Sequence, residues 1–279
     1  MSLSNMKPLL EAAEKQNAAV GSFSVSSLEM IGGVLRAAEE RNTPVILQVA
    51  ECRLKHTPLN LLGPAMLAGA RNASVPVCVH LDHGLTRECV LEALNLGFTS
   101  VMFDGSRYDM EENIRLSAEV AALARAHGAD SEGEVGVIGR SEDGREIVPR
   151  CADPDESVFF ARATGVTAMA VAIGNAHGIY KGTPQLRFDL LEKIRKGTSV
   201  PLVLHGGSGI SEADFKHCIS LGVRKINIAT AIFMACRAAA NEAGDYFDFS
   251  ARAEEAAYQT ALQHLDIFGS FSADKEAKH

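Results

Sequence analysis

Short apolar segments alternate with amphipathic segments from one end of this sequence to the other, and no other feature restricts the fold as strongly. The apolar segments lie at residues 19–25, 44–49, 76–84, 100–106, 130–136, 168–174, 201–207 and 225–230. Segments with the apolar spacing of helices lie between them, for example at 28–41, 110–128, 212–221 and 250–267. Strands that alternate strictly with helices form a parallel sheet with right-handed crossovers.

About eight such strands close into a (β/α)₈ TIM barrel, and an open, doubly wound sheet is the main alternative. A barrel of this kind needs roughly 250 residues. The 279 residues therefore predict one barrel domain that spans 1–279 and carries a C-terminal helical extension. The polar stretch GRSEDGREIVPRC at 139–151 predicts a mobile loop after the fifth strand.

The charge and the apolar runs exclude several classes of protein. The formal net charge is -8, and no stripe of Lys and Arg is present, so we expect no nucleic-acid partner. No apolar run approaches the roughly 20 residues of a membrane span, and the start MSLSNMKPLL lacks the apolar core of a signal peptide. These features predict a cytoplasmic protein without a membrane partner. The scattered cysteines contain no CxxC pair and predict reduced, packed side chains.

Three histidines stand at the C-terminal ends of predicted strands, and a glycine follows each: His83 in LDHG, His177 in NAHG and His205 in LHGG. The C-terminal ends of barrel strands meet at one face, where barrel active sites lie. Three imidazoles with one open position are a common catalytic zinc set, so we predict a metal site there. His80 lies inside the third strand and fits the barrel layer or the surroundings of the metal. We expect the remaining histidines to be solvated: His56, His127, His217, His264 and His279.

Three carboxylates accompany these histidines. Asp82 directly precedes His83 and could pass a proton to an oxygen that gains charge in a transition state. The alternative for Asp82 is a partner that orients a histidine. Asp104 ends the fourth strand and Glu134 the fifth. Each fits the surroundings of the metal, a secondary metal position, or a purely structural hydrogen-bond acceptor.

A glycine-rich turn after the seventh strand and a polar end of the eighth predict a phosphate site. In barrels, the loops after these two strands and a helix N-terminus often hold phosphate. Glycine lets the backbone approach the anion, and the hydroxyl groups add donors. The residues are Gly206, Gly207, Ser208 and Gly209 after the seventh strand, and Asn227, Ile228, Ala229 and Thr230 at the end of the eighth.

Taken together, these segments resemble the class II fructose-bisphosphate and tagatose-bisphosphate aldolases. The resemblance covers nearly the whole chain, and the shared segments occur in the family's order. They are LDHG, GEVG with EDG, DPDESVFFARATG, AVAIGNAHGIY, PLVLHGGSGI and KINIAT. The resemblance implies a zinc-dependent aldolase that uses dihydroxyacetone phosphate as one partner and works as a homodimer or homotetramer.

The resemblance also implies roles for single residues. His83, His177 and His205 would bind Zn²⁺, with Asp104 and Glu134 as additional metal-associated carboxylates. Asp82 would transfer the proton at the oxygen of the aldehyde half, and Glu142 in SEDG would be the base for enolisation. Gly178, Gly206, Ser208, Asn227 and Thr230 would hold the proximal phosphate of the ketose. Backbone near Gly178 and Gly206 could also hold a monovalent cation, Na⁺ or K⁺.

The sequence departs from the family at three places. Family members often carry FNV near strand one, where this chain has Phe23-Ser24-Val25, and a serine after strand two, where it has Ala50. Many carry DPR before the last helix, whose arginine reaches the distal phosphate, and here Ser250 replaces that arginine. These changes spare the metal and the proximal phosphate, so we expect weak discrimination for a phosphate on the aldehyde.

Two other functions agree with the same residues. A metal-dependent epimerase or isomerase of a sugar phosphate needs the same stabilisation of an enolate. A non-catalytic subunit that supports a partner aldolase is the alternative outside the enzymes. Loss of a histidine or of Glu142 would favour such a subunit, and all of them are present.

Overall fold

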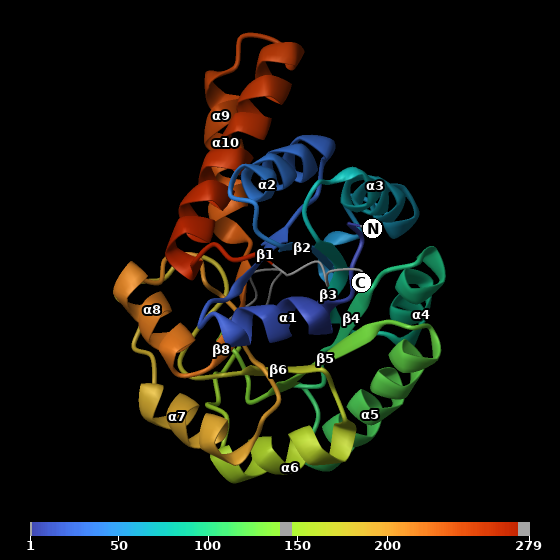
Figure 1. The fold of residues 1–279 in the computed structure, drawn as a ribbon, viewed down its shortest axis with the longest axis vertical. Coiled ribbons are helices and arrows are strands. Elements are labelled where there is room, and N and C mark those ends of the chain that lie inside the picture. The colour runs from blue at the N-terminus through green and yellow to red at the C-terminus, as the bar shows by residue number, and fades with distance from the viewer. Residues whose placement is uncertain (1, 140–146, 273–279) are drawn as a thin grey trace, which may run out of the picture.

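Eight parallel strands close into a barrel in the computed structural model, which describes residues 2–139 and 147–272 (Figure 1). The strands follow the order β1 to β8 around the ring, and β8 pairs with β1. This closure confirms the predicted (β/α)₈ barrel and excludes the open sheet. Their bounds are β1 (Val20–Ser24), β2 (Val45–Ala50), β3 (Val77–Gly84), β4 (Ser100–Phe103), β5 (Asp130–Val135), β6 (Ala168–Val171), β7 (Leu202–Leu204) and β8 (Val223–Ile228).

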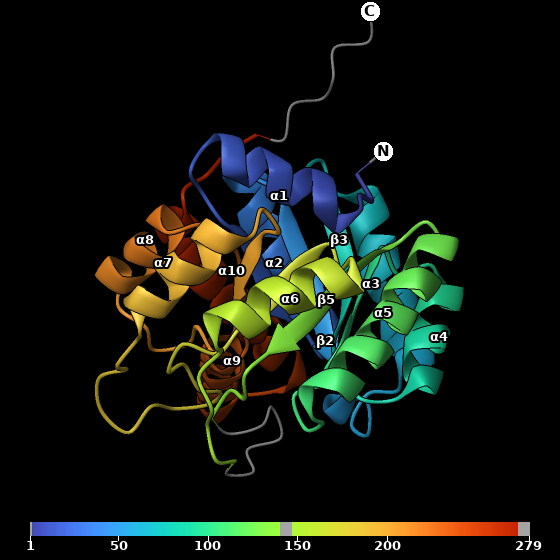
Figure 2. The same cartoon turned by 90° about the horizontal axis from the view of Figure 1, so that it is seen from below.

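Helix α1 (Met6–Lys15) closes one end of the barrel (Figure 2). Its apolar face buries Met6, Leu9 and Leu10 completely, in one cluster with Ile46 and Val203 from the strands. Because that end is filled by apolar side chains, the opposite end, where the strands finish, is the one that can present polar groups.

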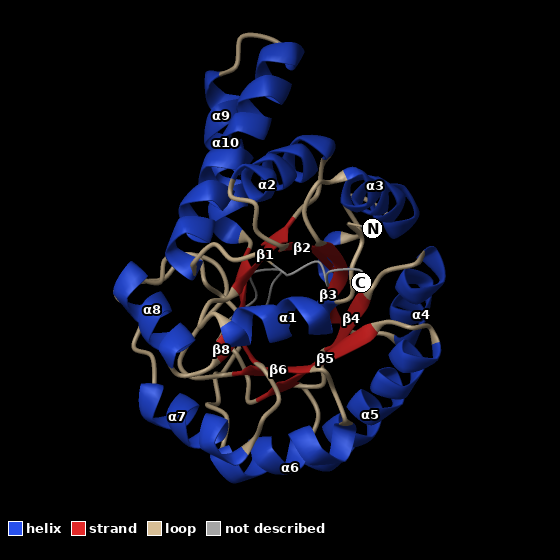
Figure 3. Ribbon diagram, in the orientation of Figure 1, coloured by secondary structure: helices blue, strands red, loops and turns tan. Residues whose placement is uncertain are grey.

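The other helices surround the barrel (Figure 3). Their bounds lie close to those that the apolar spacing predicts, with one exception. The last helix begins earlier than predicted, because the side chain of Asp245 caps it by accepting from the backbone N–H of Asp248. Within the described residues, no helix has both the length and the apolar character needed to cross a membrane. The helices are α2 (Leu28–Glu40), η1 (Glu51–Arg53), α3 (Leu59–Asn72), α4 (Arg87–Leu96), α5 (Met110–Ala126), α6 (Pro154–Thr164), α7 (Phe188–Gly197), α8 (Glu212–Ser220), α9 (Thr230–Glu242) and α10 (Tyr246–Phe268).

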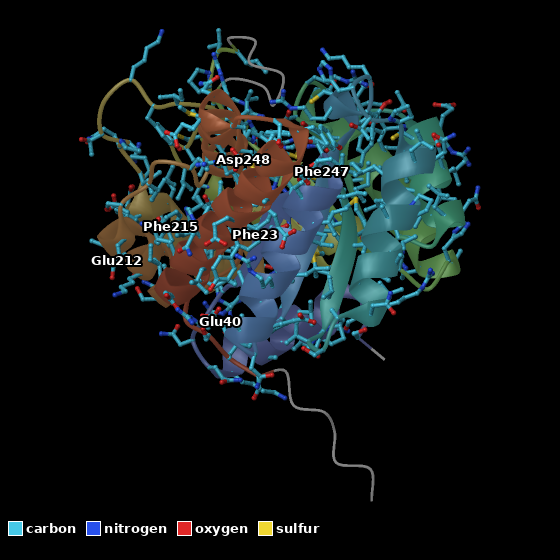
Figure 4. The ribbon with its side chains drawn as sticks, turned by 90° about the horizontal axis from the view of Figure 1, so that it is seen from above. Phe23, Glu40, Glu212, Phe215, Phe247 and Asp248 are labelled. Carbon is cyan, nitrogen blue, oxygen red and sulfur yellow. The ribbon has the colours of Figure 1, made fainter. Side chains whose placement is uncertain are left out.

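The C-terminal helix α10 packs against the barrel through aromatic rings. Phe23 of β1 and Phe215 of α8, both labelled in Figure 4, contact rings of α10. The ring centroid of His264 on α10 lies 6.5 Å from that of Phe23 and 6.3 Å from that of Phe215. The ring centroids of Phe268 and Phe215 are 5.1 Å apart. The expectation that His264 is solvated was therefore wrong. Burial lowers its pKa, and its Nδ1 lies 2.7 Å from the carbonyl oxygen of Thr260.

Candidate active site

The end of β3 brings two neighbouring residues to the same side of the backbone. Successive strand residues normally face opposite sides, but the pairing of β3 with β4 shifts register between Leu81 and Gly84. His83 has a φ of 42°, in the left-handed region, a conformation that costs about 1–3 kcal/mol for residues other than glycine. This turn places both Asp82 and His83 in the barrel mouth. At Gly84 a Cβ would lie 2.4 Å from the carbonyl oxygen of Met102, so only glycine fits.

The three histidines of the predicted zinc set come together at this end of the barrel. The ring centroids of His83 and His205 are 4.6 Å apart, those of His83 and His177 4.9 Å, and those of His177 and His205 5.9 Å. One nitrogen of each ring lies within 4.8 Å of the others, and all three side chains are buried. His83 lies on β3, His177 lies in the connection after β6, and His205 directly follows β7.

Two carboxylates determine which ring nitrogens face the centre of this cluster. Asp104 lies 2.7 Å from His83 Nδ1, and Glu132 lies 2.8 Å from His205 Nε2. A carboxylate that accepts from one nitrogen leaves the lone pair of a neutral imidazole on the other nitrogen. The remaining nitrogens, His83 Nε2 and His205 Nδ1, face each other at 2.8 Å. Without a metal ion, a proton on one of these two nitrogens can be shared between them as a hydrogen bond. A zinc ion that replaces that proton would find a lone pair on each ring, so the donor set fits zinc.

The charges of the cluster shift the pKa values of its members. Burial opposes protonation of His83, but Asp82 and Asp104 outweigh it and hold its pKa well above the ordinary value. Burial and the neighbouring His83 lower the pKa of His205. Burial opposes ionisation of Asp104, yet its bond with His83 keeps its pKa well below the ordinary range. Burial, followed by the charge of Asp104, raises the pKa of Glu134.

Asp104 and Glu134 occupy different places around the histidines. Asp104 is bonded to His83 and also accepts from the backbone N–H of Ser106 at 3.1 Å, so it orients the ring. Glu134 lies 4.0 Å from the Nδ1 atoms of both His83 and His205. His83, Asp104 and Glu134 also form a second group whose ligand atoms lie close enough to share one ion.

Both oxygens of the Asp82 carboxylate accept hydrogen bonds from amide side chains. Gln48 Nε2 donates to Oδ2 at 3.0 Å, and Asn227 Nδ2 donates to Oδ1 at 3.1 Å. Gln48 is itself oriented by strand one, because Ser22 donates to its Oε1 and Ser24 accepts from its Nε2. Ser24, at the place where the family often has asparagine, thus helps to orient the Gln48 amide that donates to Asp82.

Our sequence analysis missed three polar residues inside the barrel. Glu132 contacts His205, Lys225 Nζ lies 2.9 Å from Glu132 Oε2, and Gln48 holds Asp82. The alternation of β5 contains a signal for Glu132, because residues two apart on a strand share a face and Glu134 faces the site. Lys225 carries the same signal, because it stands two residues before the predicted Asn227 on β8. No such spacing indicates Gln48. His80 lies in the barrel layer, as predicted, with Nδ1 2.8 Å from Ser100 Oγ.

The glycine-rich turn after β7 meets the start of α9. Ser208 Oγ accepts from the backbone N–H of Ala231 at 3.0 Å. Gly206 has a φ of 65°, and a Cβ there would lie 2.2 Å from the carbonyl oxygen of Ala176. Tyr180 donates to the Gly206 carbonyl at 2.9 Å and so ties the connection after β6 to this turn.

The other residues predicted to bind phosphate differ in the groups that they can offer to an anion. Gly178, with a φ of 82°, lies in the connection after His177, and Gly207 follows Gly206 directly. The side chain of Asn227 is directed to Asp82, and Ile228 and Ala229 have apolar side chains, so the latter two can offer only backbone groups. Thr230 begins α9. Glu142, the predicted base in the 139–151 stretch, lies outside the described residues.

The barrel brings a buried histidine–carboxylate cluster to the C-terminal ends of its strands, the face at which barrel enzymes carry their active sites. The sequence pattern of the family described as fructose-bisphosphate aldolase class-II matches residues 4–273. The chain belongs to this class II aldolase family, and it is therefore an aldolase, a lyase that acts on a carbon–carbon bond.

Individual relatives agree with this assignment. The chain is 42% identical over 238 residues to the fructose-bisphosphate aldolase of Geobacillus stearothermophilus, with 82% of each chain covered. It is 41% identical over 235 residues to the 6-phospho-5-dehydro-2-deoxy-D-gluconate aldolase of Shouchella clausii. That match covers 82% of this chain and 80% of the relative. The crystal structure of the YdjI aldolase from Escherichia coli K12 superposes with a TM-score of 0.88 at 35% identity, and covers 99% of this chain and 100% of the other.

Proposed function

We propose that this aldolase is zinc-dependent and reversibly cleaves a ketose phosphate or bisphosphate into dihydroxyacetone phosphate and an aldehyde. One observation carries the proposal. His83 and His205, whose ring orientations are set by Asp104 and Glu132, bring one nitrogen each to within 2.8 Å of the other. Next to them is Asp82, and both oxygens of its carboxylate accept hydrogen bonds from amide side chains. These contacts support a cation site that would lie beside a positioned proton carrier.

His83, His177 and His205 would hold the zinc ion, which when bound would act as a Lewis acid on the substrate carbonyl. Asp82 would carry the proton of the aldehyde half. In condensation it protonates the new alkoxide, and in cleavage it takes the same proton back. No lysine imine is required, and the ammonium group of Lys225 is already engaged by Glu132 and Asn227.

The turn Gly206–Ser208 and the start of α9 would hold the phosphate of the dihydroxyacetone half. A helix N-terminus favours an anion because its backbone N–H groups and its dipole point toward it. Gly178 and Thr230 would complete this site, together with Asn227 and the backbone of Ile228 and Ala229. Backbone near Gly178 and Gly206 would offer a place for Na⁺ or K⁺. Glu142 would be the base for enolisation.

The experiment is a screen for retro-aldol cleavage of ketose mono- and bisphosphates, coupled to detection of triose phosphate, with metal analysis of the same protein. We expect about one zinc per chain, because structural and catalytic zinc sites of this kind bind one ion. We also expect the activity to disappear on chelation and to return with zinc. Full activity of metal-free protein would contradict the proposal. Sedimentation would test the homodimer or homotetramer, and cell fractionation the cytoplasmic location.

A further inference from the structure

A continuous chain of contacts runs through the barrel interior from a histidine of the cluster to Asp82. His205 Nε2 lies 2.8 Å from Glu132 Oε1, and Glu132 Oε2 lies 2.9 Å from Lys225 Nζ. Lys225 Nζ donates to Asn227 Oδ1 at 2.8 Å, and Asn227 Nδ2 donates to Asp82 Oδ1 at 3.1 Å. We call these five residues the interior chain. Four of them lie on β3, β5 and β8, and His205 directly follows β7.

Lys225 is the central residue of the interior chain, and its chemistry fixes the direction of its hydrogen bond to Asn227. An ammonium group has three donors and no acceptor. Asn227 must therefore turn its oxygen toward Lys225, which leaves its NH₂ group to face Asp82. Without that donor, the amide of Asn227 could equally present its oxygen to the carboxylate, and the two would repel.

The other contact of Lys225 acts on the metal side. Glu132 is completely shielded from solvent, as are Lys225 and His205. A buried carboxylate without a partner is costly, and a paired one keeps its charge and its position. Lys225 thus holds Glu132 in place to accept from His205 Nε2, which directs the other nitrogen, Nδ1, toward His83.

We propose that Lys225 is a positioning residue for both halves of the site, and this inference rests on the proposed function. Through Asn227 it presents an N–H donor to Asp82, and through Glu132 it sets the tautomer of His205. One buried ammonium group therefore aligns the proton carrier with the metal-binding nitrogen. Lys225 does not touch the substrate.

The test uses two variants and one control. Lys225→Met with Glu132→Gln replaces the buried ion pair by a neutral pair, which avoids an isolated buried charge. Asn227→Ala breaks only the connection to Asp82 and keeps the ion pair. Ser100→Ala is the control, because Ser100 is fully buried in the same barrel interior and contacts His80 outside the interior chain.

Three quantities are measured for each protein: cleavage of the substrate found in the screen, exchange of the C1 proton of dihydroxyacetone phosphate with solvent, and the zinc dissociation constant by chelator competition. Exchange does not need Asp82, whereas cleavage does. We expect both chain variants to slow cleavage relative to exchange by about 10²-fold, the loss typical of a misplaced group. Only Lys225→Met with Glu132→Gln should also weaken zinc binding, by about 10–100-fold.

Two results would overturn the inference. One is a Lys225→Met/Glu132→Gln protein that keeps the wild-type ratio of cleavage to exchange and binds zinc as tightly as Ser100→Ala. A second is an Asn227→Ala protein that only raises KM, which would make Asn227 a phosphate ligand alone. If the double variant does not fold, Asn227→Ala decides the Asp82 half by itself. A wild-type protein that neither exchanges nor cleaves would refute the proposed function instead.

Discussion

Position 250 offers the sharpest test of how this enzyme treats the far end of its substrate. Where the family often has an arginine, Ser250 on α10 donates to Glu29 Oε1 at 2.9 Å. Burial opposes ionisation of Glu29, but its backbone hydrogen bond and the hydroxyls of Ser27 and Ser250 outweigh it and lower its pKa. A carboxylate therefore stands beside the place of the missing cation.

The magnitude follows from the lost contact. A hydrogen bond to a charged group contributes roughly 1.5–3 kcal/mol net. At about 1.4 kcal/mol for each factor of ten, the absence of an arginine lowers the preference for a phosphorylated aldehyde by about ten- to a hundredfold. Ser250→Arg in a Glu29→Gln background should restore a preference of that size, because the competing carboxylate is then neutral.

The assay compares kcat/KM for cleavage of a ketose 1-phosphate with that of the matching bisphosphate, in the wild type, in Ser250→Arg/Glu29→Gln and in Glu29→Gln as the control. The wild type should discriminate weakly. A wild-type preference for the bisphosphate above about a thousandfold, some 4 kcal/mol, would refute the reasoning. It would show that another cation binds the distal phosphate, and Arg53, which lies 5.6 Å from the ring of Phe233 on α9, would be the first residue to replace.

Three further predictions concern other parts of the site. Glu142→Ala should slow exchange of the donor C1 proton by about 10²–10⁴-fold, and exchange at the wild-type rate would exclude Glu142 as the base. Asp104→Asn should weaken zinc binding by about 10–100-fold in a chelator competition, because His83 loses the carboxylate that sets its tautomer, and unchanged affinity would leave Asp104 a structural acceptor. Gly206→Ala should lower the free energy of unfolding by about 1–3 kcal/mol in urea, since its φ is 65° and the new Cβ would meet the Ala176 carbonyl at 2.2 Å. An unchanged midpoint would show that the turn relaxes without cost.

The architecture could be predicted from the sequence because its signals are local. Each strand is a short apolar run and each helix an amphipathic one, so their order requires no knowledge of distant contacts. A parallel barrel brings the C-terminal ends of all its strands to one face. We placed His83, His177 and His205 at such ends, and that was enough to predict that they meet. The structure differs for His177, which lies in the connection after β6 and not at the end of that strand.

Contacts across the barrel interior depended on the tertiary structure alone. Nothing in the residues around Lys225 indicates that it pairs with Glu132, because the two strands are not neighbours in the ring. The apolar rings around His264 come from β1, α8 and α10, and so a position that looks solvated on its own helix is partly buried.

The orientation of Asp82 and His83 shows the same division most clearly. The sequence determined that these residues end a strand at the catalytic face of the barrel. Simple alternation would send them to opposite sides, since successive side chains of a strand diverge. Only the register shift against β4, with His83 in the left-handed region, turns both into the mouth. That shift arises from pairing with another strand, so its cause lies outside the local sequence.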